Sequence, residues 1–72
     1  MNVRDPRVVF GIIVRKDREA RGLSQAQLAE RIGTIQAYIS RLERGLENPG
    51  LLTMDQLARA LGRSLDVTKA WI

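Results

Sequence analysis

In this 72-residue chain, the side chains best suited to specific hydrogen bonding lie between Gln36 and Arg44. On a helix with about 3.6 residues per turn, one arc of this segment carries Gln36, Ala37, Ser40, Arg41 and Arg44. Glutamine can pair with adenine, and arginine with guanine, through two hydrogen bonds each in the major groove. The opposite arc is apolar and holds Ile35, Ile39 and Leu42. The segment therefore has one face suited to reading base edges and one suited to packing.

Two helices joined by a tight turn are needed to keep the polar arc of the segment 36–44 exposed to solvent. A capping box of Ser24 and Gln27 predicts the start of the first helix, and the small Ala29 allows the second helix to cross it closely. Gly33 stands at the turn, where a positive φ costs little only for glycine. The segment 25–44 is therefore predicted to be a helix-turn-helix.

Helical patterns also flank this segment. Asp5 and Pro6 predict the start of a helix that runs to about Arg21. A fourth helix begins either at Leu51, after Gly50, or at a later capping box of Thr53 and Gln56, and Ser64 is expected to cap a short fifth helix. Because no apolar pattern alternates, we expect no strands. The predicted fold class is all-α: one domain over residues 1–72, a compact five-helix bundle.

The amino-acid composition favours some classes of function and excludes others. Twelve Lys and Arg against eight Asp and Glu give a net charge of +4, which favours polyanionic partners. The chain has no cysteine and no histidine, so disulfides and thiolate metal sites are excluded and the commonest general base is missing. We therefore predict no enzyme, no catalytic residue, no metal site and no cofactor. With no signal peptide and no membrane-spanning run, a cytoplasmic protein is expected.

Four runs of sequence carry a family resemblance. They are LSQAQLAERIG from Leu23, YISRLERG from Tyr38, the pair Asn48-Pro49 and ARALGRSLD from Ala58. Together they resemble the XRE family, the Cro and phage-repressor type helix-turn-helix domains of the lambda-repressor-like fold, which include restriction-modification controller proteins. The resemblance covers about Phe10 to Asp66.

The resemblance implies a division of labour on the DNA. The helix over 36–44 would be the recognition helix, with base contacts from Gln36, Ala37, Ser40 and Arg41. Phosphate contacts would come from Ser24, Gln25, Tyr38 and Arg44, although for Tyr38, at the border of the two arcs, packing is an equal alternative. Gln25 would also support the first recognition residue. Arg18 and Glu43 match a structural ion pair.

Three positions depart from the family pattern. Ile35 stands where relatives have a serine or threonine cap, so Thr34 is expected to cap the helix instead. Asp17 replaces a frequent leucine and is expected to be exposed or paired with Arg21. Gly50 replaces a usual serine.

The last residues raise the question of assembly. Trp71 and Ile72 either fold back onto the small core or form a subunit contact. Relatives of this length commonly dimerise through their last helices, and we predict a homodimer through residues 51–72, with Leu65, Val67, Trp71 and Ile72 in the interface.

The expected function is a transcriptional repressor or controller that binds a near-palindromic double-stranded operator as a dimer. The alternative is an antitoxin-like protein-interaction module that regulates its own operon. RNA polymerase and a toxin-like protein are further candidate partners, and no membrane is expected among them.

Overall fold

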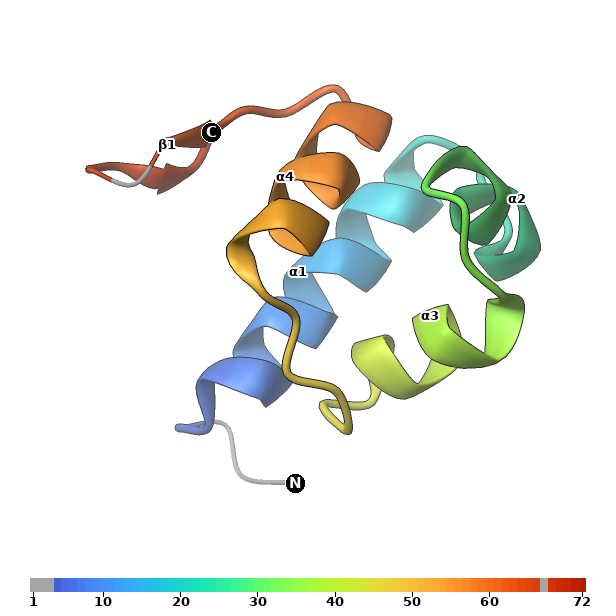
Figure 1. Ribbon diagram of the computed structural model, residues 1–72, viewed down its shortest axis with the longest axis horizontal. Coiled ribbons are helices and arrows are strands. Elements are labelled where there is room, and N and C mark those ends of the chain that lie inside the picture. Colours follow the sequence, from blue (N-terminus) through green and yellow to red (C-terminus); the bar gives the residue numbers. More distant parts are fainter. Residues whose placement is uncertain (1–3, 67) are drawn as a thin grey trace.

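The computed structural model describes residues 4–66 and 68–72. Within these residues the chain forms four helices followed by one antiparallel pair of strands (Figure 1). The elements are α1 (Pro6–Ala20), α2 (Gln25–Arg31), α3 (Gln36–Glu43), α4 (Leu51–Ala60), β1 (Leu65–Asp66) and β2 (Ala70–Trp71). In the described part of the chain, no helix is both long and apolar enough to cross a bilayer.

The helix starts follow the local signals for α1 and α2. The Asp5 carboxylate accepts a hydrogen bond from the Arg7 backbone N–H at 2.9 Å, and Pro6 is the first helical residue. The capping box is complete: Ser24 Oγ accepts from the Gln27 N–H at 3.0 Å, and Gln27 Oε1 accepts from the Ser24 N–H at 2.8 Å. Helix α4 begins at Leu51, the first of the two predicted alternatives, with no side-chain cap.

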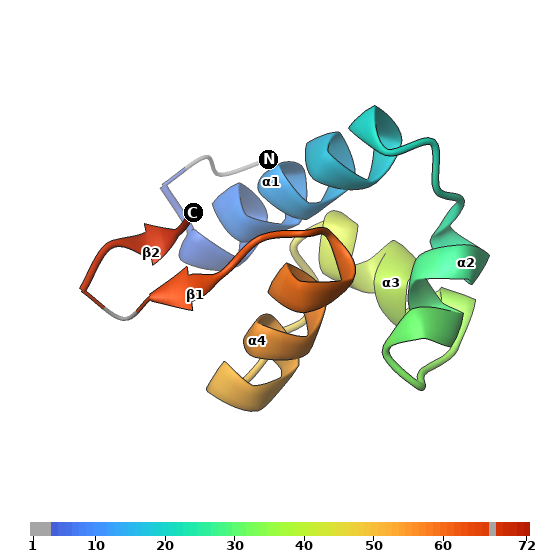
Figure 2. The same cartoon turned by 90° about the horizontal axis from the view of Figure 1, so that it is seen from above.

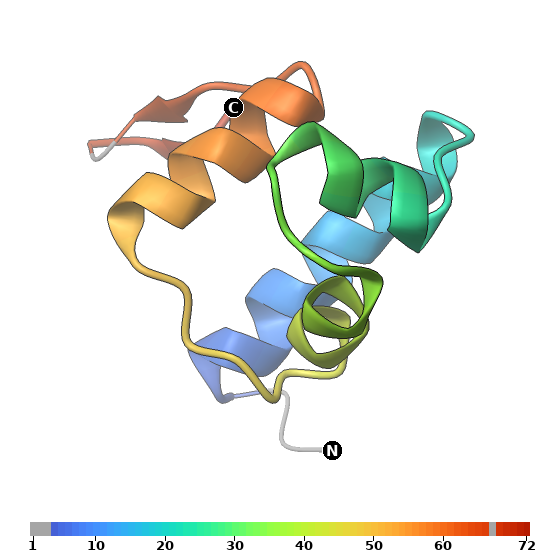
Figure 3. The same cartoon turned by 45° about the vertical axis from the view of Figure 1, so that its right-hand side comes forward.

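All four helices contribute to one core. Its buried members are Val14, Leu28, Ala29, Ile39, Leu42, Leu57 and Leu61. Helix α3 lies against both α1 and α2, and Figure 3 shows α3 nearly end-on, with α2 above it. At Gly11 of α1, an added Cβ would clash with the Leu42 carbonyl oxygen and lie 3.0 Å from that of Glu43. The absence of a side chain there lets α1 and α3 approach closely.

The predicted helix-turn-helix over 25–44 is present. Gly33 has φ +73°, and the next N–H, of Thr34, donates to the Ala29 carbonyl at 2.9 Å, which closes the end of α2. Ala29 is buried in the core beside this turn, at 2% exposure.

The prediction that Thr34 caps α3 is wrong. The N-cap residue is Ile35, in extended backbone (φ −105°, ψ 154°), and no side chain caps the helix. The backbone of Thr34 instead completes the turn after α2. Ile35 is also 64% exposed and does not belong to the apolar arc, because a non-helical residue does not follow the helical periodicity. Gln36 is the first helical residue.

The predictions of a fifth helix and of no strands are also wrong. Ser64 does not cap a helix: its N–H donates to the Ile72 carbonyl at 2.6 Å, and the Ile72 N–H returns a bond to Ser64 at 3.1 Å. The Asp66 carboxylate accepts from the Thr68 N–H and hydroxyl at 2.9 and 2.7 Å. These bonds reverse the chain between β1 and β2, which pair Leu65 with Trp71. Residue Val67 lies outside the described residues.

The strand pair lies away from the helix-turn-helix. In two perpendicular views it stands on one side of the molecule, and α2 stands on the opposite side (Figures 1 and 2).

Candidate nucleic-acid interface

The outer face of α3 has the composition that its periodicity predicted. Ile39 and Leu42 are buried in the core at 0% and 1% exposure. Five residues on the other side reach solvent: Gln36, Ala37 and Arg44 are exposed, and Ser40 and Arg41 are half-buried. The structure therefore brings the four predicted base-contacting residues and Arg44 onto one accessible face.

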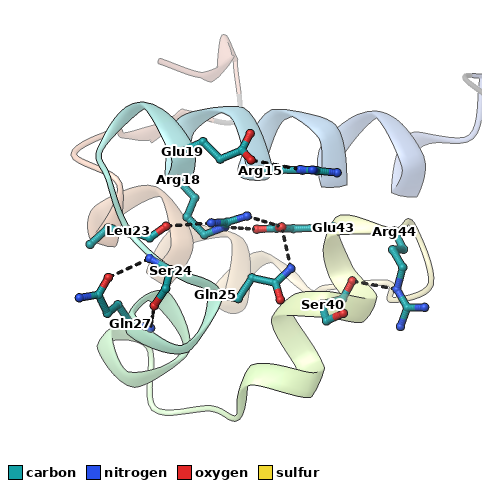
Figure 4. A network of polar contacts seen from close by, with 10 residues as sticks. All are labelled: Arg15, Arg18, Glu19, Leu23, Ser24, Gln25, Gln27, Ser40, Glu43 and Arg44. Carbon is teal, nitrogen blue, oxygen red and sulfur yellow. Dashed lines mark hydrogen bonds and ion pairs between the residues drawn. The ribbon is translucent and has the colours of Figure 1, made fainter.

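A buried ion pair anchors α3 to α1. Arg18 donates from Nε to Glu43 Oε2 at 2.7 Å and from Nη2 to Glu43 Oε1 at 3.0 Å (Figure 4). Its third nitrogen, Nη1, donates to the Leu23 carbonyl at 2.8 Å. The hydrogen bonds that Arg18 donates to Glu43 raise the pKa of Arg18. The Arg18–Glu43 pair implied by the family resemblance is thus present, and it fixes the buried side of α3 to α1.

Gln25 joins α2 to the same pair. Its side-chain Nε2 donates to Glu43 Oε1 at 3.1 Å (Figure 4). Among the described residues no hydrogen bond links Gln25 to Gln36, so the expected support of the first recognition residue is not seen. Gln25 instead fixes the start of α2 against the end of α3.

The remaining predicted phosphate contacts lie around this face. Ser24 is exposed at the start of α2, and Arg44 Nε donates to the Ser40 carbonyl at 3.3 Å. Tyr38 is half-buried and packs against the core, and this burial, followed by the charge of Glu47, raises the pKa of its hydroxyl. Packing is therefore confirmed for Tyr38, and its phosphate contact stays a prediction.

One ion pair at this face was not predicted. Arg41 Nε donates to Glu47 Oε2 at 2.7 Å. Glu47 follows the end of α3, where helical periodicity no longer applies, so no sequence pattern indicates the contact.

Asp17 has partners other than those predicted. Its carboxylate accepts two bonds from Arg63, both at 2.8 Å, and one from Trp71 Nε1 at 2.7 Å. The bonds from Arg63 are the main cause of the lowered pKa of Asp17, and Arg21 contributes only through its charge. Trp71 also packs edge-on against Phe10, with ring centroids 5.3 Å apart. The strand pair is therefore tied back onto α1, the first of the two alternatives for Trp71.

Of the other residues predicted for a dimer contact, Leu65 and Ile72 lie near this junction. Leu65 is half-buried and Ile72 is 50% exposed. An open apolar hollow adjoins them, lined in part by Val9, Phe10, Ile13, Met54, Leu65 and Trp71. Across residues 4–66 and 68–72, no group of three or more acidic side chains could hold a metal ion.

Comparisons with known proteins agree with this geometry. The sequence model of the HTH_3 family, described as Helix-turn-helix, matches residues 14–67. The chain is 42% identical over 57 residues to an uncharacterized HTH-type transcriptional regulator from Mycobacterium tuberculosis. That alignment covers 79% of this chain and 41% of the relative, so the chain spans less than half of the relative's length.

Two solved structures have the same fold. The restriction-modification controller protein C.AhdI from Aeromonas hydrophila is 37% identical with a TM-score of 0.77, covering 86% of this chain and 90% of that one. SinR, the master regulator for biofilm formation, was crystallised in complex with DNA. It is 30% identical with a TM-score of 0.69, covering 74% of this chain and 86% of that one.

Proposed function

The chain belongs to the HTH_3 family of helix-turn-helix proteins, and on this basis we propose that it is a transcriptional regulator that binds double-stranded DNA sequence-specifically. One observation carries the proposal. The solvent-facing side of α3 carries polar and basic residues, while its other side is fixed by the buried Arg18–Glu43 pair and the core. A rigid helix with such a face fits the major groove.

Base reading is assigned to the α3 face. Gln36 and Arg41 can each offer two hydrogen bonds to one base, adenine for the amide and guanine for the guanidinium. Ala37 and Ser40 lie between them and are small enough to let the helix approach the base edges. The SinR structure supports DNA binding by a protein of this fold, since that relative was crystallised with DNA.

Phosphate contacts are assigned to the rim of the face. Arg44 is exposed at the end of α3, Ser24 and Gln25 lie at the start of α2, and Tyr38 is half-buried on α3. Contacts of this kind set the register on the duplex without reading sequence. They also make binding weaken steeply as salt rises, because condensed counterions are released.

We further propose that the regulator acts in the cytoplasm as a homodimer on a near-palindromic operator. The strand pair stands away from α2 (Figure 2), and Leu65 and Trp71 of that pair line the apolar hollow, so a contact through Leu65, Trp71 and Ile72 leaves the proposed DNA face free. Val67 belongs to the same proposed contact by its place in the chain. Two-fold symmetry would place two copies of α3 about one DNA turn apart.

Selection of bound duplexes from a random pool tests this function. The expected product is one short half-site repeated in inverted orientation at a fixed spacing. An unenriched pool would contradict sequence-specific binding, and a single half-site without a repeat would contradict the dimer alone. Sedimentation of the free protein gives an independent test, with a monomer at high micromolar concentration contradicting the dimer.

A further inference from the structure

Arg41, the strongest candidate for a guanine contact, is not free on the surface of α3. Its Nε donates to Glu47 Oε2 at 2.7 Å, and the two side chains are 43% and 27% exposed. Glu47 lies in the segment between α3 and α4, so the carboxylate reaches Arg41 from outside the helix. The contact joins two parts of the backbone at the edge of the proposed DNA face.

The pair uses only one edge of the guanidinium. In the part of the chain that the structure describes, Nη1 and Nη2 of Arg41 make no hydrogen bond. These two nitrogens form a fork that can donate to O6 and N7 of a single guanine. A partner on Nε restricts the rotation of a long side chain and leaves the fork available.

The negative charge of Glu47 also favours base selectivity at Arg41. A carboxylate beside a DNA-facing surface repels phosphate and offsets the positive charge of Arg41. Arg41 is then attracted less strongly to phosphates in general, which are the same in every sequence. Its contacts with one base edge depend on direction and are kept. The Arg41–Glu47 pair therefore lowers the affinity for DNA of any sequence and raises the discrimination between bases at the position that Arg41 contacts.

We infer that Glu47 is a positioning residue that sets the base selectivity of Arg41. The inference rests on the proposed function, and it adds a specificity determinant outside the recognition helix. Glu47 is not assigned a contact with DNA; it acts by orienting the Arg41 fork and by suppressing contacts with phosphate.

Two substitutions at Glu47 and a control at Asp55 test the inference on a selected half-site, with Arg41→Ala as the reference variant. Glu47→Ala removes the partner, and Glu47→Gln keeps a hydrogen-bond acceptor without the charge. Asp55→Ala is the matched control, because it removes one carboxylate from an arginine pair on α4, where Asp55 accepts from Arg59 Nε at 3.0 Å. Arg41→Ala first identifies the base pair that Arg41 reads, as the position where discrimination is lost. Dissociation constants are measured for the selected duplex and for the three alternatives at that base pair, and thermal melting confirms folding.

Glu47→Ala is expected to reduce discrimination at that base pair by about threefold or more, within the range set by a bidentate contact, while binding to random duplex becomes tighter. Glu47→Gln and Asp55→Ala should keep most of the discrimination, and Glu47→Ala should have no effect in the Arg41→Ala background. Unchanged discrimination in Glu47→Ala, or an equal loss in Glu47→Gln, would overturn the inference and leave the proposed function standing. If Arg41→Ala itself changes no base preference, the proposed role of Arg41 fails first.

Discussion

Arg18 of α1 and Glu43 of α3 form two hydrogen bonds, at 2.7 and 3.0 Å, with both residues buried. Glu43 lies on the same helix as the proposed base-reading residues but points to the inside. The orientation of the α3 face is therefore set by a contact between charges that are largely shielded from solvent. Gln25 adds α2 to this contact through Glu43 Oε1.

Glu43→Ala is expected to destabilise the fold strongly. Removing one partner leaves the Arg18 guanidinium buried without its counter-charge, which costs about 3–5 kcal/mol. Urea denaturation measures the change in the free energy of unfolding. The double variant Arg18→Met, Glu43→Leu should recover much of the loss, because neither charge then remains buried. A loss below about 1 kcal/mol in the single variant, the range of a surface pair, would contradict a buried anchor.

Gly11→Ala should also lower stability, although alanine is favoured over glycine in a helix by about 1 kcal/mol. The added Cβ would clash with the Leu42 carbonyl oxygen, and separating α1 from α3 costs about 1–3 kcal/mol. Gly50→Ala is the matched control, since a Cβ there meets nothing within 4 Å. A thermal melt of Gly11→Ala at or above the wild-type midpoint would show that the helices do not approach so closely.

Acid should loosen the strand pair through Asp17. Because the folded-state pKa of Asp17 is lowered, its stabilising effect is present above the ordinary aspartate pKa of about 3.9 and is lost as the pH falls through the lowered value. Trp71 is the only tryptophan and donates to this carboxylate, so its fluorescence reports the loss.

The comparison variant for this titration is Asp17→Asn. Its free energy of unfolding should fall less between pH 6 and pH 3 than that of the wild type, with both values chosen to span the roughly 3.9 reference. The lowered pKa values of Asp5 and Asp66 still contribute in both proteins. Identical pH profiles for the two proteins would remove Asp17 from the acid response.

Arg44→Ala should weaken binding about equally for the selected operator and for random duplex. A phosphate contact carries no sequence information, and its loss should reduce the slope of log K against log salt by about one. Arg15→Ala on α1 is a suitable control, because Arg15 is exposed and, among the described residues, its ion pair is with Glu19 on its own helix. A loss confined to the operator would instead make Arg44 a base-reading residue.

Local signals predicted the helices that carry the candidate site. The capping box of Ser24 and Gln27, the turn at Gly33 and the apolar positions Ile39 and Leu42 each depend on neighbours a few residues away. Such signals are readable in a single sequence. They were enough to separate the buried face of α3 from its exposed face.

The wrong predictions concern residues whose structure is determined by contacts distant in sequence or by side-chain hydrogen bonds in a turn. Asp17 finds Arg63 and Trp71, which lie 46 and 54 residues further along the chain. A fifth helix was expected after Ser64, but Asp66 accepts bonds from Thr68 and the chain reverses into a strand pair. In the short segment 65–72, no hydrophobic periodicity distinguishes a final helix from a strand pair.

The most direct measurement compares the wild type with Arg41→Ala on one selected operator and on random duplex at the same salt concentration. Arg41→Ala is expected to lose roughly 1–3 kcal/mol of operator binding, with relaxed preference at one base pair and little change on random duplex. Equal affinities of variant and wild type for both duplexes would contradict the claim that the α3 face reads DNA sequence.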